Sequence, residues 1–66
     1  MHWSQDKETI YPGDLVMLDS KEYEVGMCRH WGLGLYLGKE RAWHSVYWFR
    51  LCLRGLTALH ALIKVS

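Results

Sequence analysis

The chain is 66 residues long, half of them hydrophobic and four of them tryptophan, and its net charge at pH 7 is only +1. A single domain of this size leaves little room for an enclosed pocket, so we expect no enzyme, no catalytic residues and no cofactor. The charge falls short of the basic balance of a dedicated nucleic-acid-binding protein, and no apolar stretch approaches the roughly 20 residues of a membrane-spanning helix.

The charges are unevenly spread along the chain. Residues 1–25 contain six acids and two lysines, a net charge of −4, whereas residues 26–66 contain six bases and one acid, a net charge of +5. Two interpretations stay open. Acidic and basic strands could lie side by side and neutralise each other, or the basic half could form a face for an acidic partner.

Residues 1–10 are interpreted as an N-terminal arm and residues 11–66 as the folded domain. The arm is mainly polar, and its one tryptophan, Trp3, is its expected anchor. The start of the chain lacks the basic, apolar and small-residue succession of a signal peptide. We therefore expect a protein that is not secreted, with Cys28 and Cys52 as reduced thiols.

The domain begins with a turn and a strand. Pro12 restricts φ and Gly13 tolerates a positive φ, which predicts a turn leading into a strand over residues 15–18. The charged connection that follows contains a brief alternation at residues 22–25. We interpret this segment as a short edge strand, whose charges would discourage aggregation.

Two alternating segments in the middle third predict a β-hairpin. Residues 32–38 alternate leucine with glycine or tyrosine, and residues 43–49 are mostly large or β-branched. Between them, residues 38–41 (Gly-Lys-Glu-Arg) are the expected turn.

The expected register of this hairpin places Trp48 on the leucine face of the first strand. The pairs expected in this register are Leu33 with Val46, Leu35 with His44, and Tyr36 with Trp43. A slip of one residue would exchange the faces of the second strand. Which face is buried therefore stays open.

Beyond Phe49 the pattern is mixed. We expect a turn at Arg54 and Gly55, a fourth strand near residues 56–60 and a fifth strand at residues 63–65. The alternative is a helix, because several apolar residues could share one helical stripe, namely Leu51, Leu53, Leu56, Leu59 and Ile63. Gly55 inside that stripe and the β-branched residues near its end favour strands.

Four short segments occur in a characteristic order along the chain. They are residues 12–16 (Pro-Gly-Asp-Leu-Val), 32–35 (Gly-Leu-Gly-Leu), 46–49 (Val-Tyr-Trp-Phe) and 62–65 (Leu-Ile-Lys-Val). Over roughly residues 11–66 the series resembles small SH3-like β-barrel proteins of tailed bacteriophages, especially phages of cyanobacteria and marine bacteria. The resemblance implies an all-β fold, a small five-stranded, partly open barrel. It implies no activity, because such barrels serve variously as virion components, adaptors and nucleic-acid binders.

Candidate metal and phosphate sites do not have the required spacings. The possible zinc ligands include no C-x₂-C or H-x₃₋₅-H pair; they are Cys28, His30, His44, Cys52 and His60. Gly32, Gly34 and Gly38 lack the spacing and the following helix of a phosphate-binding loop. We therefore expect no metal site.

The surplus of aromatic and basic residues is the main indication of function. Trp, Tyr and Arg are enriched in protein interfaces, and one small core does not need all of those present. The residues expected to bind a partner are Trp3, Trp31, Tyr36, Arg41, Trp43, Tyr47, Arg50 and Arg54.

This surplus indicates protein–protein docking, and the resemblance to phage proteins implies that the chain is a non-enzymatic virion structural or assembly component, in the virion or the host cytoplasm. Its partner would be another virion protein or a second copy of the chain, which implies an oligomer or a larger assembly, and no membrane partner is expected. One alternative is a nucleic-acid-binding module that uses an aromatic-basic face, formed by Arg41, Trp43, Arg50 and Arg54. A narrower alternative is capture of a basic proline-rich peptide by the acidic residues 19–24 together with Trp31.

Overall fold

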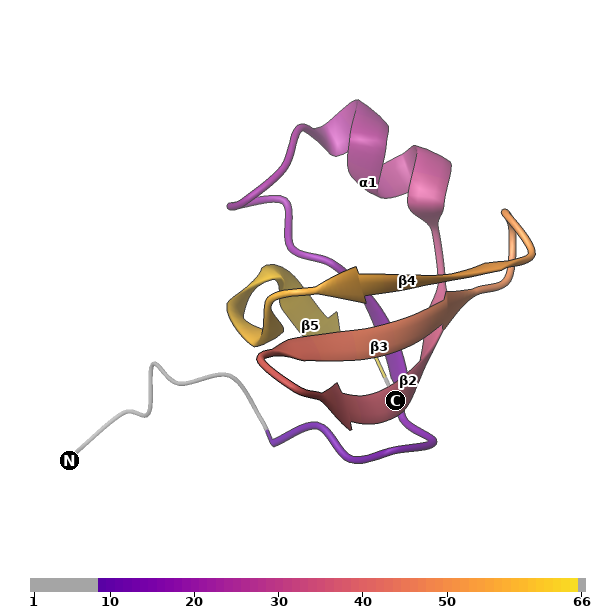
Figure 1. Cartoon of the computed structure of the whole chain (residues 1–66). Coiled ribbons are helices and arrows are strands. Elements are labelled where there is room, and N and C mark those ends of the chain that lie inside the picture. The colour runs from indigo at the N-terminus through magenta and orange to yellow at the C-terminus, as the bar shows by residue number, and fades with distance from the viewer. Residues whose placement is uncertain (1–8, 66) are drawn as a thin grey trace, which may run out of the picture.

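The computed structural model describes residues 9–65, and within that range the chain is mostly β, with five antiparallel strands and two short helices (Figure 1). Trp3, the expected anchor of the N-terminal arm, lies outside the described residues. In chain order the elements are β1 (Leu15–Leu18), α1 (Val25–Trp31), β2 (Gly34–Glu40), β3 (Trp43–Trp48), β4 (Leu53–Thr57), the 3₁₀-helix η1 (Leu59–Ala61) and β5 (Leu62–Lys64).

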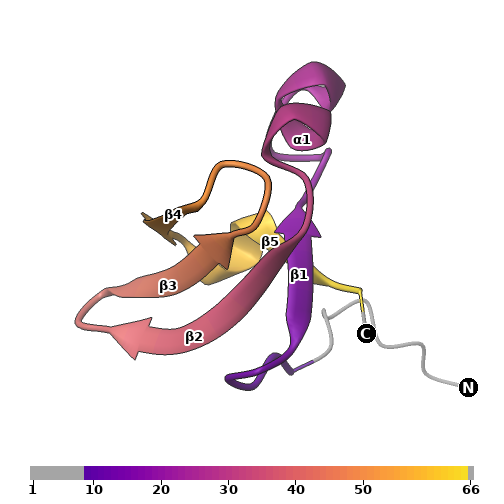
Figure 2. The ribbon, with the colours of Figure 1, turned by 90° about the vertical axis from the view of Figure 1, so that its right-hand side faces the viewer.

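The strands form one open sheet in the order β4-β3-β2-β1-β5. The last strand returns to pair with the first, so that Met17 lies opposite Ile63 and Leu18 opposite Leu62. Figure 2 shows that β2 and β3 sweep across β1 at an angle, which gives the sheet a curved shape. The sheet therefore has an inner, concave face and an outer face.

The inner face carries the hydrophobic core. Its members come from β1, β2, β3 and β5, with one contribution from α1, and are Val16, Leu18, Cys28, Tyr36, Val46, Trp48 and Leu62. Val46 is fully buried, as expected if its side chain faces the core. On each side of the bulge between Tyr36 and Gly38, successive side chains of β2 point to opposite faces of the sheet.

The register of the hairpin differs from the expected one. Leu35 pairs with Tyr47, three residues beyond its predicted partner His44. An odd shift exchanges the faces, so the leucines of β2 face outward. Gly34 and Tyr36 share the inner face with Trp48, and Tyr36 pairs with Val46 in place of Trp43.

The hairpin turn also lies further along the chain than predicted. Strand β2 continues to Glu40, with a bulge between Tyr36 and Gly38, and the turn is formed by Arg41 and Ala42. Arg41 has a left-handed backbone, with φ of 58°, which is uncommon for a residue other than glycine.

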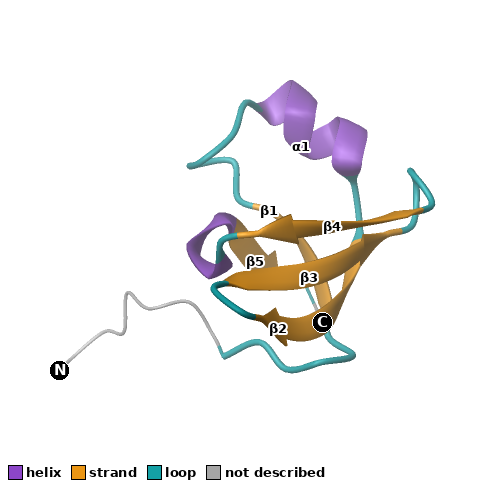
Figure 3. Ribbon diagram, in the orientation of Figure 1, coloured by secondary structure: helices purple, strands orange, loops and turns teal. Residues whose placement is uncertain are grey.

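The predicted edge strand at residues 22–25 is wrong, because a helix, α1, begins at Val25 (Figure 3). Its first turn has no side-chain cap, and Gly26 is a weak helix former. Tertiary packing stabilises the helix, since Cys28 is buried in the core and Trp31 packs against it. Gly32, with φ of 67°, ends the helix and donates its N–H to the carbonyl of Cys28.

The segment after Phe49 also differs from the prediction. Arg54 and Gly55 lie inside β4, and the turn that precedes them is at residues 49–52. Only the first part of the predicted strand at residues 56–60 is extended, because η1 follows. The predicted last strand is confirmed with its bounds moved by one residue, and the alternative long helix does not form. No helix among residues 9–65 is long and apolar enough to cross a membrane.

Candidate functional site

The residues predicted to bind a partner lie in several separate places. Tyr36 is only 4% exposed, so it belongs to the core and not to a surface. Its hydroxyl lies 2.6 Å from Nδ1 of His44, and the two rings stack with their centres 5.8 Å apart. Burial raises the pKa of the Tyr36 hydroxyl above its ordinary value.

An outer aromatic face is formed by Trp43, Tyr47, Arg54 and Leu56, all of which belong to β3 and β4. Tyr47 and Arg54 are direct cross-strand partners. The guanidinium of Arg54 lies 3.2 Å from a carboxylate oxygen of Glu40, so its charge is compensated locally. This face is therefore more aromatic than basic. Arg41 is exposed nearby in the hairpin turn.

Among the described residues, two close contacts join acidic side chains of the first part of the chain to the second part, one an ion pair with Lys64 and the other a contact with the imidazole of His60. Lys64 lies 3.6 Å from Asp14, and His60 lies 3.5 Å from Glu22. At these positions acidic and basic segments lie side by side, as one interpretation of the charge asymmetry expects.

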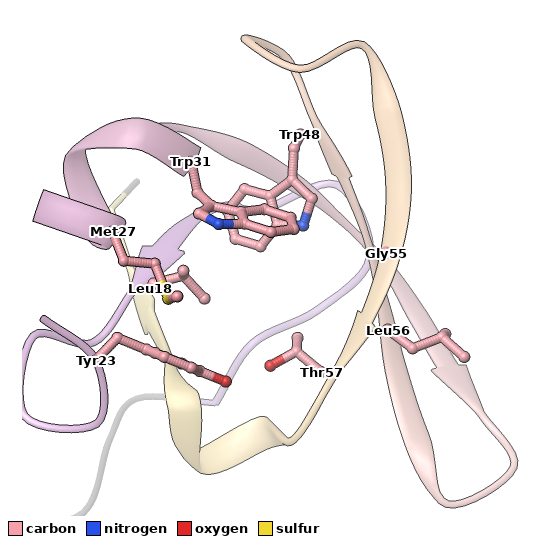
Figure 4. Close-up of a pocket in the computed structure, with 8 residues that line it drawn as sticks. All are labelled: Leu18, Tyr23, Met27, Trp31, Trp48, Gly55, Leu56 and Thr57. Carbon is pink, nitrogen blue, oxygen red and sulfur yellow. The ribbon is translucent and has the colours of Figure 1, made fainter.

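A small apolar pocket, here called the edge pocket, lies between α1 and β4 and has a volume of about 220 Å³ (Figure 4). Trp31 and Trp48 meet edge to face in its wall, with ring centres 5.4 Å apart. The residues that line it are Leu18, Tyr23, Met27, Trp31, Trp48, Gly55, Leu56 and Thr57. Leu56 points away from the other seven and toward the outer face.

The indole nitrogen of Trp48 is an unused donor in the wall of this pocket. Trp48 as a whole is only 2% exposed, but its indole N–H is not among the buried polar atoms that lack a partner, and no hydrogen bond links it to another group of residues 9–65. A Cβ placed on Gly55 would lie 3.3 Å from this nitrogen. The absence of a side chain at Gly55 therefore leaves the donor uncovered.

Strand β4 forms one edge of the pocket and one edge of the sheet. It pairs with β3 alone among the described strands, so one side of its backbone has no neighbouring strand there. The side chains of Leu53, Arg54 and Leu56 are exposed along it. Such an edge can accept another strand.

A second, more open hollow, here called the basic groove, has a volume of about 590 Å³ and is lined by Met17, Arg29, Gly32, Leu33, Phe49 and Arg50. It shares no residue with the edge pocket. Of the residues predicted to bind a partner, Arg50 alone lies here, whereas Trp31 lines the edge pocket.

The described residues include no group of three or more His, Cys, Asp or Glu side chains that could hold a metal ion. Both cysteines are free thiols; Cys28 is buried and Cys52 is exposed. Neither of the two hollows contains a nucleophile with an adjacent base.

The sequence interpretation missed most of the edge pocket. Tyr23 and Met27 were missed because α1 was not predicted, and Trp48 was placed on the leucine face of the hairpin and not at a pocket. The usable signal was Gly55, which interrupts an otherwise apolar segment. A glycine inside a strand indicates a close approach by another group. Comparison with protein-family models, with curated proteins and with solved structures found no match to this chain.

Proposed function

We propose that this chain is a non-catalytic docking domain that binds an extended segment of a partner protein along β4. The observation that carries the proposal is that the β4 edge of the sheet and the edge pocket adjoin each other, since Gly55 and Thr57 belong to both. A strand added to an edge gains affinity from its backbone hydrogen bonds and specificity from pockets for alternate side chains.

The chemistry of the pocket suits such a segment. Its apolar walls accept one aliphatic or aromatic side chain, and the edge-to-face pair of Trp31 and Trp48 forms a rigid surface for it. The N–H of Trp48 can donate to a carbonyl of the added strand, which approaches over Gly55. A ligand with an acceptor at that point would form this hydrogen bond, whereas a ligand without one would cover the donor and leave it unsatisfied.

The outer aromatic face would enlarge the contact. Leu56 and Trp43 are both exposed there, and a partner that covers β4 reaches both sides of the strand. Buried aromatic residues supply much of the binding energy in protein interfaces. The same partner would therefore cover part of the apolar and aromatic surface that exceeds what the core needs.

We also propose that the fold is an SH3-like barrel and that the chain is a virion or assembly component of a phage. An SH3-like barrel is supported by the five-stranded open sheet in which β5 returns to pair with β1, together with the resemblance of the ordered segments. The role as a virion or assembly component is supported by that resemblance alone. Mass spectrometry of purified particles tests it, since a virion component is present at a fixed stoichiometry and an absent chain contradicts the role.

The docking site can be tested with peptides selected from a displayed random library against the full chain. We expect a selected peptide to shift the backbone amide resonances of β4 and to slow their hydrogen exchange. Met27→Glu places a charge in the edge pocket and should abolish binding. Val25→Glu, at an exposed position of the same helix outside the pocket, should not. Peptides that shift only residues distant from β4 would show that the docking site is elsewhere.

A further inference from the structure

The basic groove combines two guanidinium groups from different elements. Arg29 lies in the last turn of α1, and Arg50 follows β3. Arg50 Nη1 donates a hydrogen bond of 2.7 Å to the main-chain carbonyl of Arg29. This bond positions the guanidinium of Arg50 and satisfies a carbonyl at the end of the helix. The remaining donors of its planar fork are available to a ligand.

The positive charge of the groove has no local counterpart. None of the residues that line it is acidic, and neither arginine forms an ion pair with an acid of residues 9–65. This differs from Arg54, which is paired with Glu40, and from Lys64, which is paired with Asp14. The groove is thus a place where the basic second part of the chain is not neutralised by its acidic first part.

The apolar part of the groove contains an exposed aromatic ring. Phe49 is held beside Leu33, because its N–H donates to the Leu33 carbonyl at 3.2 Å. The Phe49 ring also meets Tyr47 edge to face, with ring centres 5.7 Å apart. Phe49 is nevertheless 42% exposed, so part of its ring is open to a ligand next to the two cations.

We propose that the basic groove binds single-stranded nucleic acid, with phosphates on Arg29 and Arg50 and a base stacked on Phe49. Cations that follow the backbone and aromatic rings that accept bases are the two components of single-strand binding sites. An acidic peptide would engage the guanidiniums but leave Phe49 and Leu33 uncovered, whereas a nucleotide covers both parts at once. The site goes beyond protein docking, and because it shares no lining residue with the edge pocket, variants of the groove test it separately from the docking site.

The probe for this site is a fluorescein-labelled oligothymidylate of about 12 nucleotides, within the usual site size of single-strand binders. Its fluorescence anisotropy is measured with the full chain over a salt series. We expect affinity to fall steeply with salt, and Arg29→Gln and Arg50→Gln each to reduce the slope of log K against log salt by about 0.7. Phe49→Ala should weaken binding about tenfold at every salt concentration without changing the slope, and Phe49→Trp should restore it.

Lys39→Gln is the matched control, because it removes one exposed positive charge outside the groove. Its affinity should stay close to that of the wild type. Equal losses in Lys39→Gln and Arg29→Gln would overturn the proposal in favour of a general effect of net charge. So would the absence of binding at low salt, or a poly-glutamate peptide that binds more tightly than the oligonucleotide. Circular dichroism melting of each variant shows whether it is folded. If Arg50→Gln does not fold, the salt dependence of Arg29→Gln alone still tests the proposal.

Discussion

Gly34 of β2 lies directly opposite Trp48 of β3, and the indole ring occupies the space where a side chain of residue 34 would be. A Cβ at Gly34 would lie 2.7 Å from Cε3 of Trp48 and 2.5 Å from Cγ1 of Val46. Atoms cannot approach that closely without displacement of the core. This contact explains why the face with glycine and tyrosine is buried while the leucines of β2 face outward.

The first prediction concerns this contact. Gly34→Ala should lower the free energy of unfolding by about 3 kcal/mol, the upper end of the usual cost of overpacking a core. Urea denaturation followed by tryptophan fluorescence measures the change. Gly26→Ala is the control, because the residue is helical and no atom beyond its chain neighbours and its own helix backbone lies within 4 Å of the added methyl group. It should raise stability by roughly 0.5–1 kcal/mol, and equal stabilities of the two variants would contradict the packing described.

The second prediction tests the two faces of the sheet. Val46→Asp introduces a charge at a fully buried position, and the domain should be unfolded at 25 °C by far-ultraviolet circular dichroism, because the charge cannot be paired. Leu56→Asp, on the outer face of the neighbouring strand, should change stability by less than about 1 kcal/mol. A folded Val46→Asp variant would mean that the register is wrong.

The third prediction is a pH dependence from Tyr36. Burial raises the pKa of its hydroxyl above the ordinary value of 10.0, so above pH 10 the unfolded chain releases this proton while the folded chain retains it. Stability is therefore intact below pH 10 and falls as the pH rises toward the folded-state pKa. Tyr36→Phe should remove this decline.

The same variant should be less stable at neutral pH by about 0.5–1.5 kcal/mol, because it loses the hydrogen bond to His44. Urea unfolding curves at a series of pH values between about 8 and 11 cover the relevant range. Parallel stability profiles for the wild type and Tyr36→Phe would exclude this role for the Tyr36 proton.

The fourth prediction concerns the uncovered N–H of Trp48. Gly55→Ala places a methyl group 3.3 Å from this nitrogen and should lower the affinity for a peptide selected on β4 about tenfold, a loss of roughly 1.4 kcal/mol. The free energy of unfolding should change by less than about 1 kcal/mol. Alanine lowers the conformational entropy of the unfolded chain, and this stabilisation offsets part of the cost of the tight contact. Peptide titration and urea unfolding of the same variant separate the two effects. An unchanged affinity would show that the ligand does not reach this donor.

Much of the fold was predictable because strands leave a local pattern. Alternation with a period of two predicted the hairpin strands at residues 32–38 and 43–49, which the structure has at residues 34–40 and 43–48, since each half-buried strand needs apolar residues at every second position. The strands predicted at residues 15–18 and 63–65 lie at residues 15–18 and 62–64. Local pattern also indicated an excess of aromatic residues at the surface. The helix α1 could not be found in this way, because its seven residues contain a glycine and no capping side chain, and contacts with the core stabilise it.

The sequence alone therefore determined the approximate positions of β1, β2, β3 and β5, but not that of β4. It also determined the near-neutral charge and the surplus of aromatic and basic side chains. Only the tertiary structure decided which face of the hairpin is buried, because alternation is the same for both faces and the choice depends on the fit of Trp48 over Gly34. It likewise separated the predicted partner-binding residues, with Tyr36 in the core, Trp31 in the edge pocket and Arg50 in the basic groove. Both hollows are formed by residues distant in sequence, and their proximity depends on how the sheet curves and where α1 packs against it.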